Sequence, residues 1–190
     1  VNRQIQERLA LIESVNAARD LVNEPGSVAT PAYLEEKARA VAKQCGLKIE
    51  VLDERKLKAQ GYNGLLSVGR GGKVPPRMII LRYTPKGRAR KGGHLGLLGK
   101  GITFDTGGIY IKPGNGMWEM KGDMAGAAAT LHAMEAIARL APPVCVTGIL
   151  VTAQNYPDAN AVLPGDIFIA KNGKSVHIDD AGIQPGHFKN

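Results

Sequence analysis

A strand, a helix and a second strand follow one another between residues 94 and 154, and this order constrains the fold more than any other feature of the chain. Residues 94–101 and 144–154 are nearly continuous apolar runs, which is typical of strands buried on both faces. An alanine-rich helix is predicted between them, over 124–140. Such a unit normally forms a parallel strand pair with a right-handed crossover. We therefore predict an α/β fold in three layers, with a mostly parallel sheet flanked by helices.

Helices are also predicted in the first part of the chain. Residues 2–22 repeat apolar residues with a helical period. The apolar stripe of this helix consists of Ile5, Leu9, Ile12 and Val15. A second helix is predicted from Thr30-Pro31 to about Gly46, because threonine is a favoured N-cap, proline fits the first turn and glycine suits a left-handed C-cap. A short helix is expected over 55–60.

The remaining segments predict further strands and one hairpin. Strands are expected over 47–53, 64–72 and 77–83. Asn172-Gly173 lies between the segments IFIAK and KSVHI, which predicts a β-hairpin with a type I′ turn. The 190 residues, 44% of them hydrophobic, suffice for one core, and no repeat or low-complexity linker divides the chain. We therefore expect one domain over 1–190.

The composition narrows the class of protein. No run of about eighteen apolar residues could span a membrane. The first residues, VNRQIQERLALIE, are amphipathic and lack the apolar block of a signal peptide. Cys45 and Cys145 lie far apart, in segments expected to be buried, and form no disulfide framework or metal-binding spacing. These features predict a cytoplasmic protein. The sequence has no Gly-x-Ser-x-Gly or Walker motif, which argues against a serine hydrolase and a P-loop enzyme.

The net charge of +8 leaves two interpretations open. Part of the excess lies in one run made up of Lys86, Arg88, Arg90 and Lys91. This run is either a solvated loop between two strands or a patch that contacts phosphates. No aromatic residue interleaves with these charges, so the run has no stacking platform for single-stranded nucleic acid.

A glycine-rich stretch, Gly99 to Asp123, is the candidate functional site. It contains seven glycines, three lysines and two aspartates, and glycine lets the backbone approach a ligand closely. Ligands of open α/β sheets gather at the carboxyl ends of strands, where Lys100 and Asp105 are expected. Both aspartates offer the hard oxygen ligands that divalent metals use. The stretch therefore predicts a site that binds a cation.

Each charged residue of this stretch also has a structural interpretation. Asp123 precedes the alanine-rich helix and is a good candidate for its N-cap. Lys100 either forms an ion pair with Asp105 or loses its proton and binds the metal. Lys112 is either an exposed loop lysine or a group that polarises a carbonyl oxygen. The four histidines are scattered and are interpreted as structural; they are His94, His132, His177 and His187.

The segments GKGITFDTGGIYIKP and MKGDMAGAAATLHAM closely resemble the core signature of the leucyl aminopeptidase family of dinuclear metallopeptidases. The resemblance extends over about residues 5–179 and includes AARDLVNEPGSVATPAYL and VCVTGILVTAQNYPDANAVLPGDI. It implies that residues 1–190 are the amino-terminal part of a metallo-aminopeptidase catalytic domain, with 180–190 diverging. It also implies a truncated version of that domain's fold.

The resemblance assigns roles to individual residues. Lys100, Asp105 and Asp123 fall on metal-ligand positions, and Lys112 falls on the catalytic lysine that holds the substrate carbonyl. Met120 falls on a position that lines the pocket for the first side chain of the substrate. The implied reaction is the release of amino-terminal residues from peptides with two divalent ions, zinc or manganese. Full-length members usually assemble as hexamers.

The sequence also departs from the family pattern. After KSVHID the family continues Asn-Thr-Asp-Ala-Glu-Gly-Arg, which supplies two further metal ligands and an arginine. Here the chain continues from Asp179 with Asp180-Ala181-Gly182, and the glutamate and arginine have no counterpart. Gln154 stands where the family usually has Glu, and Leu163 where it usually has Arg. We therefore expect this chain alone to be weakly active or inactive, as a fragment or as a truncated product.

Two other classes of function remain as alternatives. Some relatives of this family bind DNA, and the net positive charge is compatible with a DNA-binding or regulatory protein. An assembly subunit that keeps the fold without peptidase activity is the third possibility.

Overall fold

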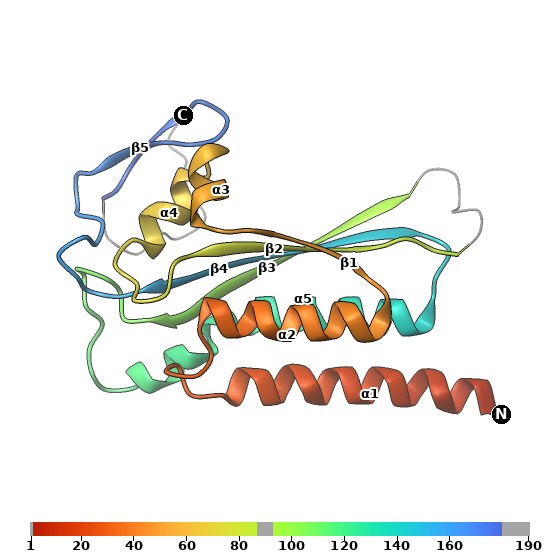
Figure 1. The fold of residues 1–190 in the computed structure, drawn as a ribbon. Helices are drawn as coiled ribbons and strands as arrows, with labels where there is room; N and C mark the ends of the chain where they lie inside the picture. Colours follow the sequence, from red (N-terminus) through yellow and green to blue (C-terminus); the bar gives the residue numbers. More distant parts are fainter. Residues whose placement is uncertain (1, 87–92, 180–190) are drawn as a thin grey trace.

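The computed structural model describes residues 2–86 and 93–179 and shows a central sheet with helices on both faces (Figure 1). The helices are α1 (Asn2–Asn23), α2 (Pro31–Cys45), α3 (Glu54–Ala59), α4 (Asn63–Gly69) and α5 (Ala125–Leu140), with the 3-10 helix η1 (Met117–Met124) directly before α5. The strands are β1 (Lys48–Leu52), β2 (Arg77–Tyr83), β3 (His94–Asp105), β4 (Cys145–Asn155), β5 (Ile167–Ile169) and β6 (Ser175–His177). The predicted α/β class with flanking helices is confirmed.

The four-stranded sheet has the order β1-β2-β4-β3 and is mixed. Only β3 and β4 run parallel; β1 pairs antiparallel with β2, and β2 pairs antiparallel with β4. The prediction of a mostly parallel sheet is therefore wrong for the described residues. The connection between β1 and β2 accounts for part of the difference. It consists of the short helices α3 and α4, which cover one end of the sheet and do not form a parallel crossover (Figure 1).

The predicted strand–helix–strand unit is present as β3, α5 and β4. Helix α5 buries a row of apolar side chains, including Leu131 and Met134, against the sheet. Helix α2 packs beside it on the same face, and its caps are as predicted: the Thr30 hydroxyl accepts a hydrogen bond from the Tyr33 amide, and Gly46 has a φ of 67°. The main core lies between these two helices and the sheet (Figure 1).

Strand β3 is an edge strand and is less buried than the sequence predicts. It pairs with β4 on one side only among the described residues, and the Leu98 side chain is 74% exposed. The strand is also longer than predicted, because it continues to Asp105. Lys100 therefore lies within β3, and Asp105 lies at its carboxyl end.

Residues 64–69 lie in the helix α4, where a strand is predicted over 64–72. Leu65 and Leu66 of α4 pack against a second cluster of apolar residues that includes Leu57 and Met78, on the face of the sheet opposite α5. A helix, and not a further strand, covers this small cluster. Tertiary packing thus overrides the local strand preference of the segment.

Helix α1 forms as predicted but presents the other face to the protein. It packs against α5 through the buried residues Ala10, Ser14 and Leu21 (Figure 1). The predicted apolar stripe is exposed, with its side chains on the outer surface: Ile5, Leu9, Ile12 and Val15. Two of these three buried residues, Ala10 and Ser14, are small, and the third, Leu21, belongs to the main core.

The predicted hairpin forms between β5 and β6, but its turn differs. Gly173 has a φ of 83°, whereas Asn172 does not have a positive φ. The Gly173 amide donates to the Ala170 carbonyl at 2.8 Å, and the Ala170 amide donates to the Lys174 carbonyl at 2.8 Å. The type I′ prediction is therefore wrong, because only one residue of the turn is left-handed, as in a hairpin closed by a glycine bulge.

No helix among the described residues is long and apolar enough to cross a membrane.

Candidate metal centre

A β-bulge in β3 places the side chains of Lys100 and Asp105 on the same side of the strand. The pairing with β4 is regular up to Ile102 opposite Ala153, and it resumes with Asp105 opposite Asn155. Three steps along β3 thus correspond to two along β4, so β3 contains one extra residue. Because side chains alternate along a strand, this extra residue shifts the parity of every later position. Asp105 follows Lys100 by five positions, and in a regular strand this odd spacing would place the two side chains on opposite sides. With the bulge the spacing is equivalent to four positions, so the two side chains lie on the same side of β3.

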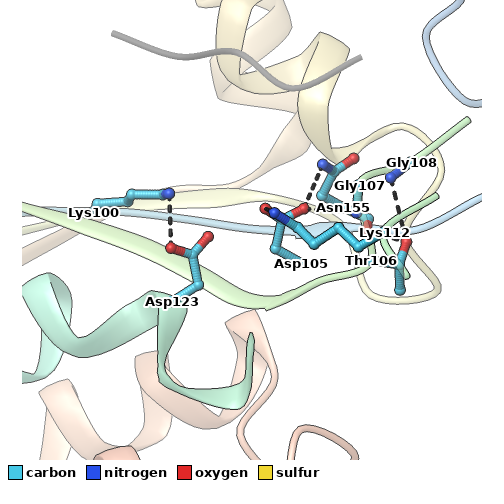
Figure 2. Close-up of polar contacts among 8 residues, drawn as sticks. All are labelled: Lys100, Asp105, Thr106, Gly107, Gly108, Lys112, Asp123 and Asn155. Carbon is cyan, nitrogen blue, oxygen red and sulfur yellow. Dashed lines mark hydrogen bonds and ion pairs between the residues drawn. The ribbon is translucent and has the colours of Figure 1, made fainter. Parts of the chain in front are cut away.

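The carboxylate of Asp105 is held by two donors on one oxygen. Its Oδ1 accepts a hydrogen bond from the Asn155 side-chain amide at 2.7 Å and another from the Gly107 backbone amide at 2.9 Å (Figure 2). Asn155 is buried, and its backbone carbonyl in turn accepts from the Thr106 amide at 3.0 Å and the Thr106 hydroxyl at 2.8 Å. These contacts orient the carboxylate and leave its second oxygen, Oδ2, without a backbone or amide donor.

The loop after β3 folds back and brings Lys112 to that second oxygen. The Lys112 amide donates to the Thr106 carbonyl at 2.8 Å, which closes the loop. Gly107 and Gly108 have φ values of 92° and 66°, a conformation that favours glycine. The Lys112 Nζ then lies 3.2 Å from Asp105 Oδ2.

A second lysine–carboxylate pair joins β3 to η1. The Lys100 Nζ lies 2.8 Å from Asp123 Oδ1 (Figure 2). The other oxygen, Asp123 Oδ2, is buried and has no hydrogen-bond partner among the described residues. A buried carboxylate oxygen without a partner is costly, and binding a cation is one way to remove that cost.

These contacts differ from two structural interpretations of the sequence. Asp123 is not the N-cap of α5: it lies inside η1, Met124 holds the cap position, and no side chain caps the helix. Lys100 does not form its ion pair with Asp105 but with Asp123. The ion pair of Asp105 is with Lys112, which is half-exposed and contacts the site carboxylate. The 3-10 turn before α5 explains both differences, because it carries Asp123 back along β3 to Lys100.

Met120 shares a face of η1 with Asp123. A 3-10 helix has three residues per turn, so residues three apart lie above one another. Met117, Met120 and Asp123 form such a row, and all three are half-buried, whereas Trp118 on another face is exposed. The structure thus places Met120 next to Asp123 along η1, one turn before it.

Asn155 is the residue of this site that the sequence prediction missed. Its position in the sequence could have indicated its place in the site. It directly follows a strand that is predicted to pair in parallel with the strand that leads to Asp105. The adjacent Gln154 is buried; it accepts a hydrogen bond from the Val74 amide at 2.8 Å and lies 3.3 Å from the Tyr156 hydroxyl. Burial raises the pKa of the Tyr156 phenol above its ordinary value, and the hydrogen bond with Gln154 opposes that rise. Leu163 is exposed.

The other predicted features lie apart from this centre or outside the described residues. His132 pairs with Glu135 on α5, with 2.7 Å between Nδ1 and Oε2, and the His94 ring lies 2.7 Å from the Thr147 hydroxyl. His177 lies 2.7 Å from Asp179. Of the basic run, Lys86 is described, while Arg88, Arg90 and Lys91 lie outside the described residues. His187 and the divergent segment 180–190 lie outside them as well.

The residues present fit a divalent cation as a partial set of ligands. In the part of the chain that the structure describes, no amide or hydroxyl contacts Asp105 Oδ2 or Asp123 Oδ2, and hard cations prefer carboxylate oxygens. A lysine amine can add a nitrogen ligand if it loses its proton. Within residues 2–86 and 93–179, however, no three His, Cys, Asp or Glu side chains gather closely enough to hold an ion. A complete coordination sphere would need donors beyond these.

The fold and the site thus define an α/β protein with a candidate cation site at the carboxyl ends of two parallel strands. Residues 16–183 match the model of the cytosol aminopeptidase family, catalytic domain, and the chain belongs to this family. It is 48% identical over 174 residues to a probable cytosol aminopeptidase of Geobacter sp. (strain M21), covering 92% of this chain and 35% of that protein. It is 46% identical over 188 residues to the probable cytosol aminopeptidase of Aquifex aeolicus (strain VF5), covering 97% and 38%.

Solved structures match this chain with a similar coverage. The bottromycin maturation enzyme BotP in complex with Mn matches with a TM-score of 0.88 and 39% identity, covering 95% of this chain and 38% of that one. The apo structure of leucyl aminopeptidase from Trypanosoma cruzi matches with a TM-score of 0.88 and 34% identity, covering 92% and 34%. The chain therefore spans somewhat more than a third of the length of these relatives.

Proposed function

We propose that this chain carries part of the two-metal centre of an aminopeptidase, an enzyme that releases amino-terminal residues, leucine-like ones among them, from peptides. The observation that carries this proposal is the pair of aspartates at the end of β3 and in η1, each facing a lysine (Figure 2). Asp123 Oδ2 adds a buried oxygen without a hydrogen-bond partner within residues 2–86 and 93–179. Membership of the cytosol aminopeptidase family supports the reaction type.

In this proposal Lys100, Asp105 and Asp123 hold the divalent ions, zinc or manganese. Bound divalent ions supply a polarised carbonyl and an activated water molecule. The protein contributes fixed oxygen positions: Asn155 and Gly107 orient Asp105, and the turn of η1 sets Asp123 beside Lys100. The manganese in the BotP complex supports manganese as one of the metals.

Lys112 and Met120 act on the substrate in the same proposal. Lys112 carries a fixed positive charge on a closed loop, where it can hold the carbonyl oxygen of the scissile bond and stabilise the negative charge that develops there. Met120 lies one turn from Asp123 and lines the pocket for the first side chain of the peptide. A flexible thioether suits a pocket that accepts apolar side chains of several shapes.

The environment and assembly of the protein are part of the proposal. Peptides are the partners that the family name indicates, and a cytoplasmic location agrees with the two free cysteines, Cys45 and Cys145. We propose a hexamer for the full-length protein. The DNA-binding alternative receives no support from the described residues, and most of the basic run lies outside them.

Metal binding tests the proposal directly. We expect manganese to remain bound after desalting, as measured by mass spectrometry of the metal, and Asp105→Asn to remove most of it. Asp20→Asn, an exposed carboxylate on α1, is the matched control and should bind as the unchanged protein does. Metal content that is the same in all three proteins would refute the proposed site.

Turnover is a separate measurement. We expect hydrolysis of leucine p-nitroanilide with manganese by this chain alone to be weak or absent, because no three His, Cys, Asp or Glu side chains of the described residues gather closely enough to hold an ion. Robust turnover that Asp105→Asn abolishes would confirm the site and contradict the expectation of low activity.

A further inference from the structure

The Asp105 carboxylate has one oxygen to offer, and Lys112 already contacts it. Oδ1 accepts two hydrogen bonds, from Asn155 and from Gly107, whereas Oδ2 lies 3.2 Å from the Lys112 Nζ. The Asp105 side chain is 15% exposed, so little solvent is available to replace these partners. A cation that binds Asp105 through a single oxygen would therefore bind Oδ2, the oxygen that the ammonium group contacts.

We propose that Lys112 and a divalent cation compete for Asp105 Oδ2, so that metal binding releases Lys112 from Asp105, and that Asn155 is the positioning residue that makes Oδ2 the shared oxygen. The inference rests on the proposed function, because it takes Asp105 as a metal ligand. It goes further by giving Lys112 two positions. In the metal-free protein Lys112 neutralises Asp105, and in the loaded protein it is available to a substrate carbonyl.

Charge and geometry support this exchange. Two cations near one carboxylate oxygen repel each other, so the ammonium group is expelled once the more highly charged ion binds. The Lys112 side chain is 38% exposed and reaches Asp105 from a loop, so it can turn away without disturbing the core. The backbone of that loop is fixed by the Thr106–Lys112 hydrogen bond, which keeps the released amine close to the site.

Asn155 acts through Asp105 in this proposal. Its side-chain amide occupies Oδ1 at 2.7 Å, and its backbone carbonyl holds Thr106 at the start of the loop. The same residue thus orients the carboxylate and anchors the loop that carries Lys112. Loss of the amide would let the carboxylate rotate and would weaken its single-oxygen contact with a cation.

Manganese affinity, measured from the electron paramagnetic resonance signal of free Mn²⁺, tests the roles of Lys112 and Asn155. The two substitutions should change this affinity in opposite directions. Lys112→Met removes the competitor and should tighten manganese binding about two- to fivefold, the size expected for a half-exposed ion pair. Asn155→Ala should weaken it about tenfold or more, as loss of a residue that orients a metal ligand does. Lys121→Met is the matched control, because the Lys121 ammonium lies on η1 and contacts the neutral Asn23 carbonyl at 3.0 Å. It should change the affinity less than Lys112→Met.

A spectroscopic measurement follows Lys112 itself. The ¹⁵N–¹H signal of the Lys112 ammonium group, assigned by its loss in Lys112→Arg, should move on saturation with diamagnetic Zn²⁺, while that of Lys121 stays in place. If manganese binds through Asp105 but the Lys112 signal does not move and Lys112→Met leaves the affinity unchanged, the inference is wrong and the proposed metal site stands. If no manganese binds, or Asp105→Asn has no effect on binding, both are wrong.

Discussion

Gly99 is the position where an added methyl group should be most informative, because β3 and α5 are in direct backbone contact there. A Cβ atom on Gly99 would lie 2.5 Å from the Gly126 carbonyl oxygen, 2.7 Å from the Ala127 Cα and 2.7 Å from the Thr130 Oγ1. Two of these three atoms belong to the backbone of α5 and cannot rotate away. Gly99→Ala must therefore move the helix and the strand apart.

The cost follows from this geometry. Overpacking of a well-packed contact destabilises a protein by about 1–3 kcal/mol. For a chain of this size each kcal/mol lowers the melting temperature by about 2–4 °C, so we expect a decrease of roughly 2–12 °C. The change should also weaken manganese binding, because moving the start of α5 moves η1 and separates Asp123 from Lys100.

Thermal unfolding followed by far-UV circular dichroism measures the first effect. Gly96→Ala is the matched control, because Gly96 lies in the same strand, lacks a positive φ and has no atom within 4 Å of an added Cβ. It should leave the melting temperature nearly unchanged or raise it slightly, through the lower entropy of the unfolded chain. Equal melting temperatures for the two variants would show that β3 and α5 are not in the close contact described.

Two further predictions concern the loop of Lys112 and the half-buried thiol of Cys45. Gly107→Ala should lower the free energy of unfolding by about 1–3 kcal/mol and weaken manganese binding, because Gly107 has a φ of 92° and an added Cβ would lie 2.2 Å from the Tyr110 carbonyl oxygen. Gly116→Ala is the control, because Gly116 has a φ of 78° but no atom within 4 Å of an added Cβ. It shares the backbone strain without the clash, so a titration should show unchanged metal affinity. Burial raises the pKa of the Cys45 thiol, so the folded state holds this proton more tightly than the unfolded state does, and the stability it contributes is lost as the pH rises above the ordinary thiol pKa of about 8.5. Urea unfolding between pH 7 and 10 should therefore show a steeper loss of stability for the unchanged protein than for Cys45→Ala, and parallel curves would contradict this.

Segments whose structure depends on near neighbours could be predicted from the sequence. The caps of α2 at Thr30 and Gly46 and the extent of β2 are local features, and they form as predicted. The segment 64–72 fails for the opposite reason, since a helix there covers an apolar cluster that distant parts of the chain create. The α1 stripe fails similarly, because the helix period identifies an apolar face but not which face meets α5.

For the candidate site, the sequence was sufficient to propose the residues: two aspartates and two lysines in a glycine-rich stretch, within a strand–helix–strand unit. It did not determine their partners. The folded chain shows that Lys100 pairs with Asp123, that Lys112 pairs with Asp105, and that Asn155 contacts Asp105. The physical reason is that composition and periodicity are properties of neighbouring residues, whereas these contacts depend on a bulge in β3, a 3-10 turn before α5 and the register of β3 with β4.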